Sequence, residues 1–185
     1  MKSIKKLGQG VMVAIGVLGL AGTVSAAPLA ITTCKTITVS GPYVLTKNLT
    51  HAGDCLVVKA SNVTIDLGGY VLTGNGTGRG VFADVGFGFR GIVVRNGVVT
   101  GFAHGVLLGG FNHVVDDVRV FDMTGSGIYV GDGSLVKGSV ASDNGDFGIW
   151  LVCPASAIGN TAVGNGLGGL LQQGAGCVSS QNLAP

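Results

Sequence analysis

The stretch Gly127-Ile128-Tyr129-Val130 is one copy of the motif that decides the fold, a glycine followed by apolar residues that alternate between two faces. A cysteine replaces the glycine in the first copy, and the copies are Cys55-Leu56-Val57-Val58, Gly80-Val81-Phe82-Ala83, Gly105-Val106-Leu107-Leu108, Gly127-Ile128-Tyr129-Val130, Gly148-Ile149-Trp150-Leu151 and Gly169-Leu170-Leu171-Gln172. Successive copies are 25, 25, 22, 21 and 21 residues apart. A nearly constant spacing of this length is typical of repeat proteins.

A second apolar motif follows each copy, and a weaker third one, such as Val98-Val99, comes after that. The second motif occurs as Thr64-Ile65-Asp66, Val93-Val94-Arg95, Val114-Val115-Asp116, Leu135-Val136-Lys137 and Ala157-Ile158-Gly159. Three short strands per repeat can bury their apolar faces only by stacking on the next repeat. We therefore predict an all-β parallel β-helix of about six to seven coils. A β-sandwich or a leucine-rich repeat explains this spacing less well.

The composition agrees with strands and tight turns. Of the 185 residues, 35 are glycine, 46% are hydrophobic and only 11% are charged. The apolar fraction excludes a disordered polar chain. The preference for Gly, Val, Thr and Asn over Ala, Leu, Glu and Lys disfavours an extended helical protein.

Residues 1–26 have the pattern of a signal peptide. Lys2, Lys5 and Lys6 precede an apolar run over residues 11–22, and the small residues Val24-Ser25-Ala26 follow. The run is too short to cross a bilayer comfortably. We predict that residues 27–185 form a single exported domain, secreted or periplasmic, without a transmembrane anchor. Its eight Lys and Arg against nine Asp give a net charge of 8 − 9 = −1, which disfavours nucleic-acid binding.

Three further stretches carry a resemblance to a known family. They are Gly41-Pro42-Tyr43-Val44-Leu45, Asn62-Val63-Thr64-Ile65-Asp66-Leu67-Gly68-Gly69 and Arg95-Asn96-Gly97. Over residues 34–171 the chain resembles a right-handed parallel β-helix of the pectate-lyase-like superfamily, in its small bacterial secreted group. The resemblance implies a right-handed winding and a polysaccharide or a cell-surface component as the partner. It implies no particular reaction.

Strand side chains alternate, so the register predicts which residues face the interior. From the first motif we expect Leu56, Val81, Val106, Ile128, Ile149 and Leu170 to point inward, and from the second Ile65, Val94, Val115, Val136 and Ile158. The outward neighbours of the second set are Asp66, Arg95, Asp116 and Lys137. Opposite charges in successive coils favour a solvated structural face over a catalytic cluster.

The outward residues of the first motif form an apolar column. Its members are Val57, Phe82, Leu107, Tyr129, Trp150 and Leu171. Apolar surface of this extent usually marks something that covers it. Three interpretations are open: self-association or a partner, a saccharide stacked on Tyr129 and Trp150, or cover by a loop or terminal segment of the same chain.

The four cysteines fit the coil length. Cys34 and Cys55 are 21 residues apart, and Cys153 and Cys177 are 24 apart. Residues one coil apart are vertical neighbours, so we predict the disulfides Cys34–Cys55 and Cys153–Cys177, one near each end of the repeat. Nothing in the cysteine spacing points to a redox motif or a zinc site.

Catalytic candidates are weaker. Lyases of the superfamily use clustered carboxylates for Ca²⁺ and a Lys or Arg as base, so the resemblance makes calcium a possible cofactor and Asp116, Asp117, Arg119, Asp122 and Asp143 the candidates. Aspartate is equally a favoured turn residue, and we favour that interpretation. The hydrolase pattern of the superfamily is broken, because Ala103-His104-Gly105 precedes Asp116-Asp117 and no Arg-x-Lys occurs. His51, His104 and His113 are interpreted as surface or turn residues, and no metal site is predicted.

The sequence therefore favours an exported β-helix that binds carbohydrate or a cell-surface component without competent catalysis. The partner surface would be Phe82, Leu107, Tyr129, Trp150 and Leu171. One alternative is a minimal polysaccharide lyase or glycoside hydrolase. Another is a structural or self-assembling envelope protein built on the apolar column.

Overall fold

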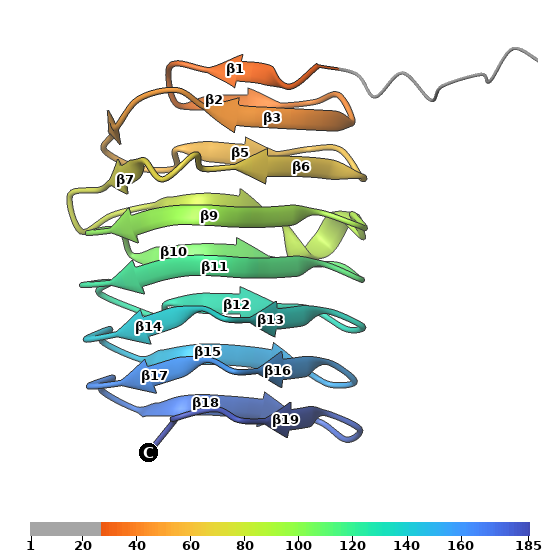
Figure 1. Ribbon diagram of the computed structural model, residues 1–185, viewed down its shortest axis with the longest axis vertical. Coiled ribbons are helices and arrows are strands. Elements are labelled where there is room, and N and C mark those ends of the chain that lie inside the picture. The colour runs from red at the N-terminus through yellow and green to blue at the C-terminus, as the bar shows by residue number, and fades with distance from the viewer. Residues whose placement is uncertain (1–26) are drawn as a thin grey trace, which may run out of the picture.

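The computed structural model describes residues 27–185 as a parallel β-helix, with coils stacked from the N-terminal to the C-terminal end (Figure 1). Each of the seven coils contributes one strand to a seven-stranded sheet. In stacking order these strands are β2 (Lys35–Ile37), β5 (Leu56–Val58), β8 (Arg79–Ala83), β10 (His104–Leu108), β12 (Ile128–Val130), β15 (Phe147–Val152) and β18 (Gly168–Gln173). The six strands from β5 to β18 carry the apolar residues of the six motif copies, which confirms the interpretation of the motif as the repeating strand.

The remaining strands form a twelve-stranded sheet that bends into two rows. The first row is β1 (Leu29–Ile31), β3 (Gly41–Leu45), β6 (Val63–Asp66), β9 (Val93–Thr100), β11 (Val114–Phe121), β13 (Leu135–Lys137), β16 (Ser156–Ile158) and β19 (Val178–Ser180). The second row is β4 (Leu49–Thr50), β7 (Val71–Thr73), the ends of β9 and β11, β14 (Val140–Ser142) and β17 (Thr161–Val163). The coils thus have the three sides expected, except that the third side of the last coil is only an isolated bridge between Thr161 and Leu183.

The winding is right-handed. In Figure 1 the chain descends from β1 to β19, the strands of the nearer sheet point left, and those of the seven-stranded sheet behind point right. The only helical segment in residues 27–185 is the short 3₁₀ turn η1 (Val85–Phe87), in the loop between β8 and β9. This loop, residues 84–91, follows β8 directly.

Vertical stacking of like residues builds the core. Ile65 pairs with Val94, Val94 with Val115, and Val115 with Val136, and all four side chains are completely buried. On the opposite sheet Val81, Val106, Ile128 and Ile149 form a similar column. Burying one such side chain contributes roughly 1.5–3 kcal/mol, so the columns are the main source of stability. Leu170, in the last coil, is only partly buried.

The prediction for Ile158 is wrong. Val136 pairs with Ala157, which is completely buried, while Ile158 pairs with the outward Lys137 and is 39% exposed. The 21-residue step from Val136 leads to Ala157, and the register of the backbone overrides the larger side chain's preference for burial.

The motif glycines are required by space inside the tube. The residues in this position and the next are both buried in β8, β10 and β15. A Cβ atom on Gly105 would overlap Val120 Cγ1 and the Gly127 carbonyl oxygen. Cys55 occupies the same position near the N-terminal end, where its side chain is buried in the disulfide to Cys34.

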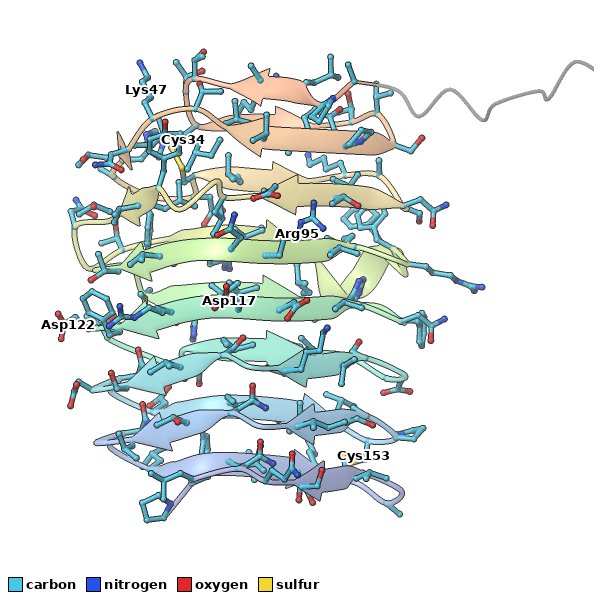
Figure 2. The ribbon with its side chains drawn as sticks, in the orientation of Figure 1. Cys34, Lys47, Arg95, Asp117, Asp122 and Cys153 are labelled. Carbon is cyan, nitrogen blue, oxygen red and sulfur yellow. A yellow bond between two sulfur atoms is a disulfide. The ribbon has the colours of Figure 1, made fainter. Side chains whose placement is uncertain are left out.

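Both predicted disulfides are present, one toward each end of the solenoid. The Cα atoms are 4.5 Å apart in Cys34–Cys55 and 4.9 Å apart in Cys153–Cys177. Figure 2 shows Cys34 in the upper coils and Cys153 in the lower ones. The two bonds therefore tie together coils near the ends, where neighbours are fewest.

Buried polar side chains satisfy backbone groups where the coils turn. Asn160 Oδ1 accepts from the Ser139 N–H, and its Nδ2 donates to the Val136 carbonyl at 2.9 Å. Asn144 Oδ1 accepts in the same way from the Met123 N–H. These bonds run between coils, because a buried amide without a partner would cost about 1–3 kcal/mol.

The interpretation of His113 as a surface or turn residue is wrong, since its side chain is completely buried. Its Nδ1 accepts from the Ile92 N–H at 3.2 Å, so Nε2 carries the proton and donates to the Gly109 carbonyl at 3.0 Å. Burial lowers the pKa of His113, against a smaller raising effect of the bond to Gly109. His113 thus hydrogen-bonds backbone groups at one corner of the coils, as the buried asparagine side chains do at other corners.

The proposed signal peptide, residues 1–26, lies outside the described residues. Within residues 27–185, no helix has the length and apolar character needed to cross a membrane.

Replacing Gly105 with alanine should lower the free energy of unfolding by about 1–3 kcal/mol, because the new methyl group has no room inside the tube. Gly86→Ala is the control, since a Cβ there would meet only Asp84 Oδ1, at 3.5 Å; its effect should stay within about 0.5 kcal/mol. Urea denaturation measures both. Equal midpoints for the two variants would contradict a steric role for the motif glycine.

Stability should fall as the pH drops below about 6.5. The unfolded chain has an unperturbed His113, of pKa 6.5, and binds a proton that the folded protein resists. His113→Asn keeps an acceptor near Ile92 and removes the titration, so it should reduce this loss. His104, whose pKa is also lowered, stays in both proteins and preserves part of it. Thermal midpoints at several pH values test this, and an unchanged pH dependence would refute it.

Candidate functional site

The alternating-charge column lies on the twelve-stranded sheet. Asp66 pairs with Arg95 on the next coil, Arg95 with Asp116, and Asp116 with Lys137. Arg95 Nε lies 3.0 Å from an Asp66 oxygen, and Lys137 Nζ lies 3.0 Å from an Asp116 oxygen. Asp116, one of the catalytic candidates, is therefore engaged in a structural ion pair.

Hydrogen bonds hold Asp66 in its ionised form. Partial burial by itself would raise the pKa of Asp66, but bonds from the Gly68 N–H and the Asn96 amide, with the charge of Arg95, lower it overall. The shallow hollow at this place is lined by Asp66, Arg95, Asn96, Asp116 and Asp117. Its charges are largely paired, as a solvated structural face requires.

The other acidic candidates occupy turn positions. Asp117, Asp122 and Asp143 have φ angles of 52°, 59° and 55°. This left-handed conformation favours Gly, Asn and Asp. Figure 2 shows Asp117 at the bend in the middle of the nearer sheet and Asp122 at its left edge. The candidates thus fall at two different corners.

Arg119, the remaining candidate, is exposed in the second half of β11, beside Val98 and Val140 of the adjacent coils. Among residues 27–185, no three His, Cys, Asp or Glu side chains lie close enough together to hold a metal ion. The residues described here do not offer Ca²⁺ the clustered carboxylates that it prefers.

The outward apolar column of the seven-stranded sheet is in register, as expected. The paired residues are Val57, Phe82, Leu107, Tyr129, Trp150 and Leu171. All six are partly buried rather than bare. Part of the cover comes from the loop after β8, because Val85 packs against Gly109, at the end of β10.

Beside this column lies a hollow of about 270 Å³, on the sheet that faces away from the viewer in Figure 1. The apolar side chains that line it are Val85, Leu107, Tyr129 and Trp150. The polar ones are His104, Ser126 and Asp146. Strands β10, β12 and β15 position most of these residues, so the hollow sits on a rigid frame.

The aromatic rings form an edge-to-face cluster. The Tyr129 and Trp150 ring centroids are 5.5 Å apart at an angle of 71°, and Phe147 contacts Trp150 at 5.8 Å with the same angle. Trp150 Nε1 donates to Gln173 Oε1 at 3.1 Å. Because these contacts fix the indole, its ring presents an ordered apolar surface to the hollow.

His104 is held as one neutral tautomer. Its Nδ1 accepts from the Ser126 N–H at 3.1 Å, which leaves Nε2 as an N–H donor. Burial lowers the pKa of His104, the charge of Arg79 lowers it further, and the charge of Asp146 opposes this. The imidazole is therefore a hydrogen-bond donor at neutral pH.

Ser126 and Asp146 complete the polar part of the hollow. Ser126 is only 3% exposed, and its hydroxyl makes no hydrogen bond within the described part of the chain; because no fully buried side-chain oxygen there lacks a partner, this hydroxyl opens on the hollow. The Asp146 carboxylate likewise has neither an ion pair nor a hydrogen bond to any residue from 27 to 185. Both groups line the hollow without a partner among the described residues, so they are available to a ligand.

Sequence reasoning missed the polar half of this hollow. His104 and Ser126 each directly precede a motif glycine, as do Arg79 and Phe147 in other coils. The residue before each motif glycine therefore occupies an equivalent position in successive coils, as the pairing of Arg79 with His104 shows. This repeated position is the sequence signal that could have identified these residues as a second column. Asp146 precedes the next coil's motif by one residue more, and only the folded chain brings it into the hollow.

Comparison of the chain with models of known protein families, with characterised proteins and with solved structures finds no match. The parallel β-solenoid is therefore established by the structure itself, and the hollow must be interpreted from its own chemistry.

Replacing Asp143 with asparagine should leave the free energy of unfolding within about 0.5 kcal/mol of the parent, because asparagine tolerates the left-handed backbone. Asp143→Ala should cost about 1–2 kcal/mol at the same φ of 55°. Chemical denaturation compares the two. A tolerated alanine would contradict the turn interpretation of this residue.

Proposed function

We propose that this protein is an exported β-helix that binds carbohydrate in the hollow on its seven-stranded sheet. The observation that carries the proposal is the combination in one hollow of two aromatic rings, Tyr129 and Trp150, with unpaired polar groups on His104, Ser126 and Asp146. A sugar ring has apolar C–H faces and a rim of hydroxyl groups. It therefore needs both kinds of surface side by side.

The polar groups match the needs of hydroxyl groups. His104 Nε2–H donates, the Asp146 carboxylate accepts, and the Ser126 hydroxyl does either. Hydrogen bonds from ligand hydroxyls to an ionised carboxylate are stronger than those between neutral groups. Three such groups around an aromatic surface can fix the orientation of one sugar unit.

His104 is not placed to act as a general base in the hollow. A general base must offer a free lone pair, and the only lone pair in the plane of the neutral His104 ring accepts from the Ser126 N–H. His104 therefore does not activate the Ser126 hydroxyl in this arrangement. The three residues serve as hydrogen-bonding partners.

Export and family membership are part of the same proposal. The pattern of residues 1–26 is that of a signal peptide, and the two disulfides fit an oxidising compartment, which the secreted space or the periplasm provides. The sequence also resembles small secreted members of the pectate-lyase-like superfamily, and this resemblance implies a carbohydrate as the binding partner.

Replacing Trp150 with alanine should weaken saccharide binding at least tenfold, which corresponds to about 1.4 kcal/mol. A glycan array identifies the ligand, and titration calorimetry on the best saccharide then measures the change. Tyr70→Ala, an aromatic substitution at an exposed position outside the hollow, is the matched control and should bind as the parent does.

Two results would overturn the proposal. One is the absence of saccharide binding by the folded parent protein. The other is binding that Trp150→Ala leaves intact, which would place the sugar elsewhere. Product formation from a bound polysaccharide would overturn the non-catalytic part and return attention to Asp116 and Asp117.

A further inference from the structure

The charges around the hollow are unbalanced toward the negative. Asp146 lines the hollow with a carboxylate that is unpaired among residues 27–185. A second carboxylate, Asp132, lies close enough to Tyr129 that its charge, after burial, adds to the raised pKa of that phenol. Both act on the aromatic pair at the centre of the hollow.

Arg79, the cation whose charge acts on His104, is already paired. Arg79 lies 3.1 Å from an Asp54 oxygen, and its guanidinium sits 4.0 Å above the centre of the Phe82 ring. The position directly across β10 from Arg79 is His104, which is neutral. No side chain that lines the hollow therefore carries a positive charge at neutral pH.

Such a hollow suits a ligand that brings its own positive charge. An ammonium group gains from an unpaired carboxylate through a charge-assisted hydrogen bond, and from the face of a tryptophan or tyrosine ring through a cation–π contact. A carboxylate-bearing sugar would meet Asp146 with the same charge, which costs free energy. A neutral sugar would use the hydrogen bonds but leave the charge of Asp146 uncompensated.

We propose that the hollow takes amino sugars with a free ammonium group, in preference to N-acetylated, neutral or acidic sugars; this rests on carbohydrate binding in the hollow. Ser126 Oγ and His104 Nε2 bind the hydroxyl groups, Trp150 and Tyr129 contact the ring, and Asp146 binds the ammonium. The ordered pair of aromatic rings beside the carboxylate distinguishes this hollow from a mere gathering of acidic residues.

Binding of three oligosaccharides of equal length tests the proposal: oligomers of glucosamine, the same oligomers fully N-acetylated, and oligouronates. The titrations are run at about pH 6, where a sugar amine is largely protonated. The fluorescence of Trp150, the only tryptophan in the chain, reports on the hollow directly. We expect glucosamine oligomers to bind at least fivefold more tightly than the N-acetylated ones, and oligouronates most weakly.

Asp146→Asn is the decisive variant. Its side chain makes no hydrogen bond to the rest of residues 27–185, so the fold should tolerate the change. It should reduce the preference for the free amine to less than about twofold, while binding of the N-acetylated oligomer stays close to that of the parent. Asp143→Asn makes the same substitution at a corner outside the hollow and should preserve the preference.

The outcomes separate this inference from the proposed function. Equal binding of free and N-acetylated oligomers, or tighter binding of oligouronates, would overturn the amino-sugar preference while leaving carbohydrate binding in place. A preference that survives Asp146→Asn would also overturn it. If no saccharide binds, the inference and the proposed function fail together.

Discussion

Hydrogen bonding between successive coils is the constraint on which this structure depends. Among residues 27–185 every strand pair is parallel, and all pairs except β1–β3 join residues about one coil apart, so the coil length fixes the vertical neighbours of each residue. Complementary residues therefore stack: valine lies on valine in the core, Asp66 lies beside the oppositely charged Arg95, and cysteine lies on cysteine near the ends. Positions and contacts that seem unrelated in the sequence have this one origin.

The same constraint decides what the sequence could predict. The architecture, the disulfides and the outward columns follow from counting residues, because they depend only on coil length and strand alternation. Ile158 was misplaced because its size was weighed above the 21-residue step from Val136 to Ala157. His113 was misplaced because polar residues were assigned to the surface, although turning coils need buried side chains to bond their backbone.

The hollow could not be predicted by counting residues along the repeat. Its floor, Tyr129 and Trp150, could be found from the period, but its depth depends on the loop at residues 84–91 folding back to place Val85 beside the column. The tautomer of His104 and the free hydroxyl of Ser126 depend on single hydrogen bonds, which no repeat pattern encodes. The proposed binding site therefore depends on the departures from the repeat, on a frame that the repeat makes rigid.

The left-handed residues recur at each corner with nearly the coil period, as Asp122, Asp143 and Gly164 do at one of them. One coil of the solenoid can therefore be duplicated or lost as a unit. Such an in-frame change leaves every remaining stack of residues continuous. Lineages of such a protein can lengthen or shorten by whole turns, whereas a change of a few residues would put one face out of step with its neighbours.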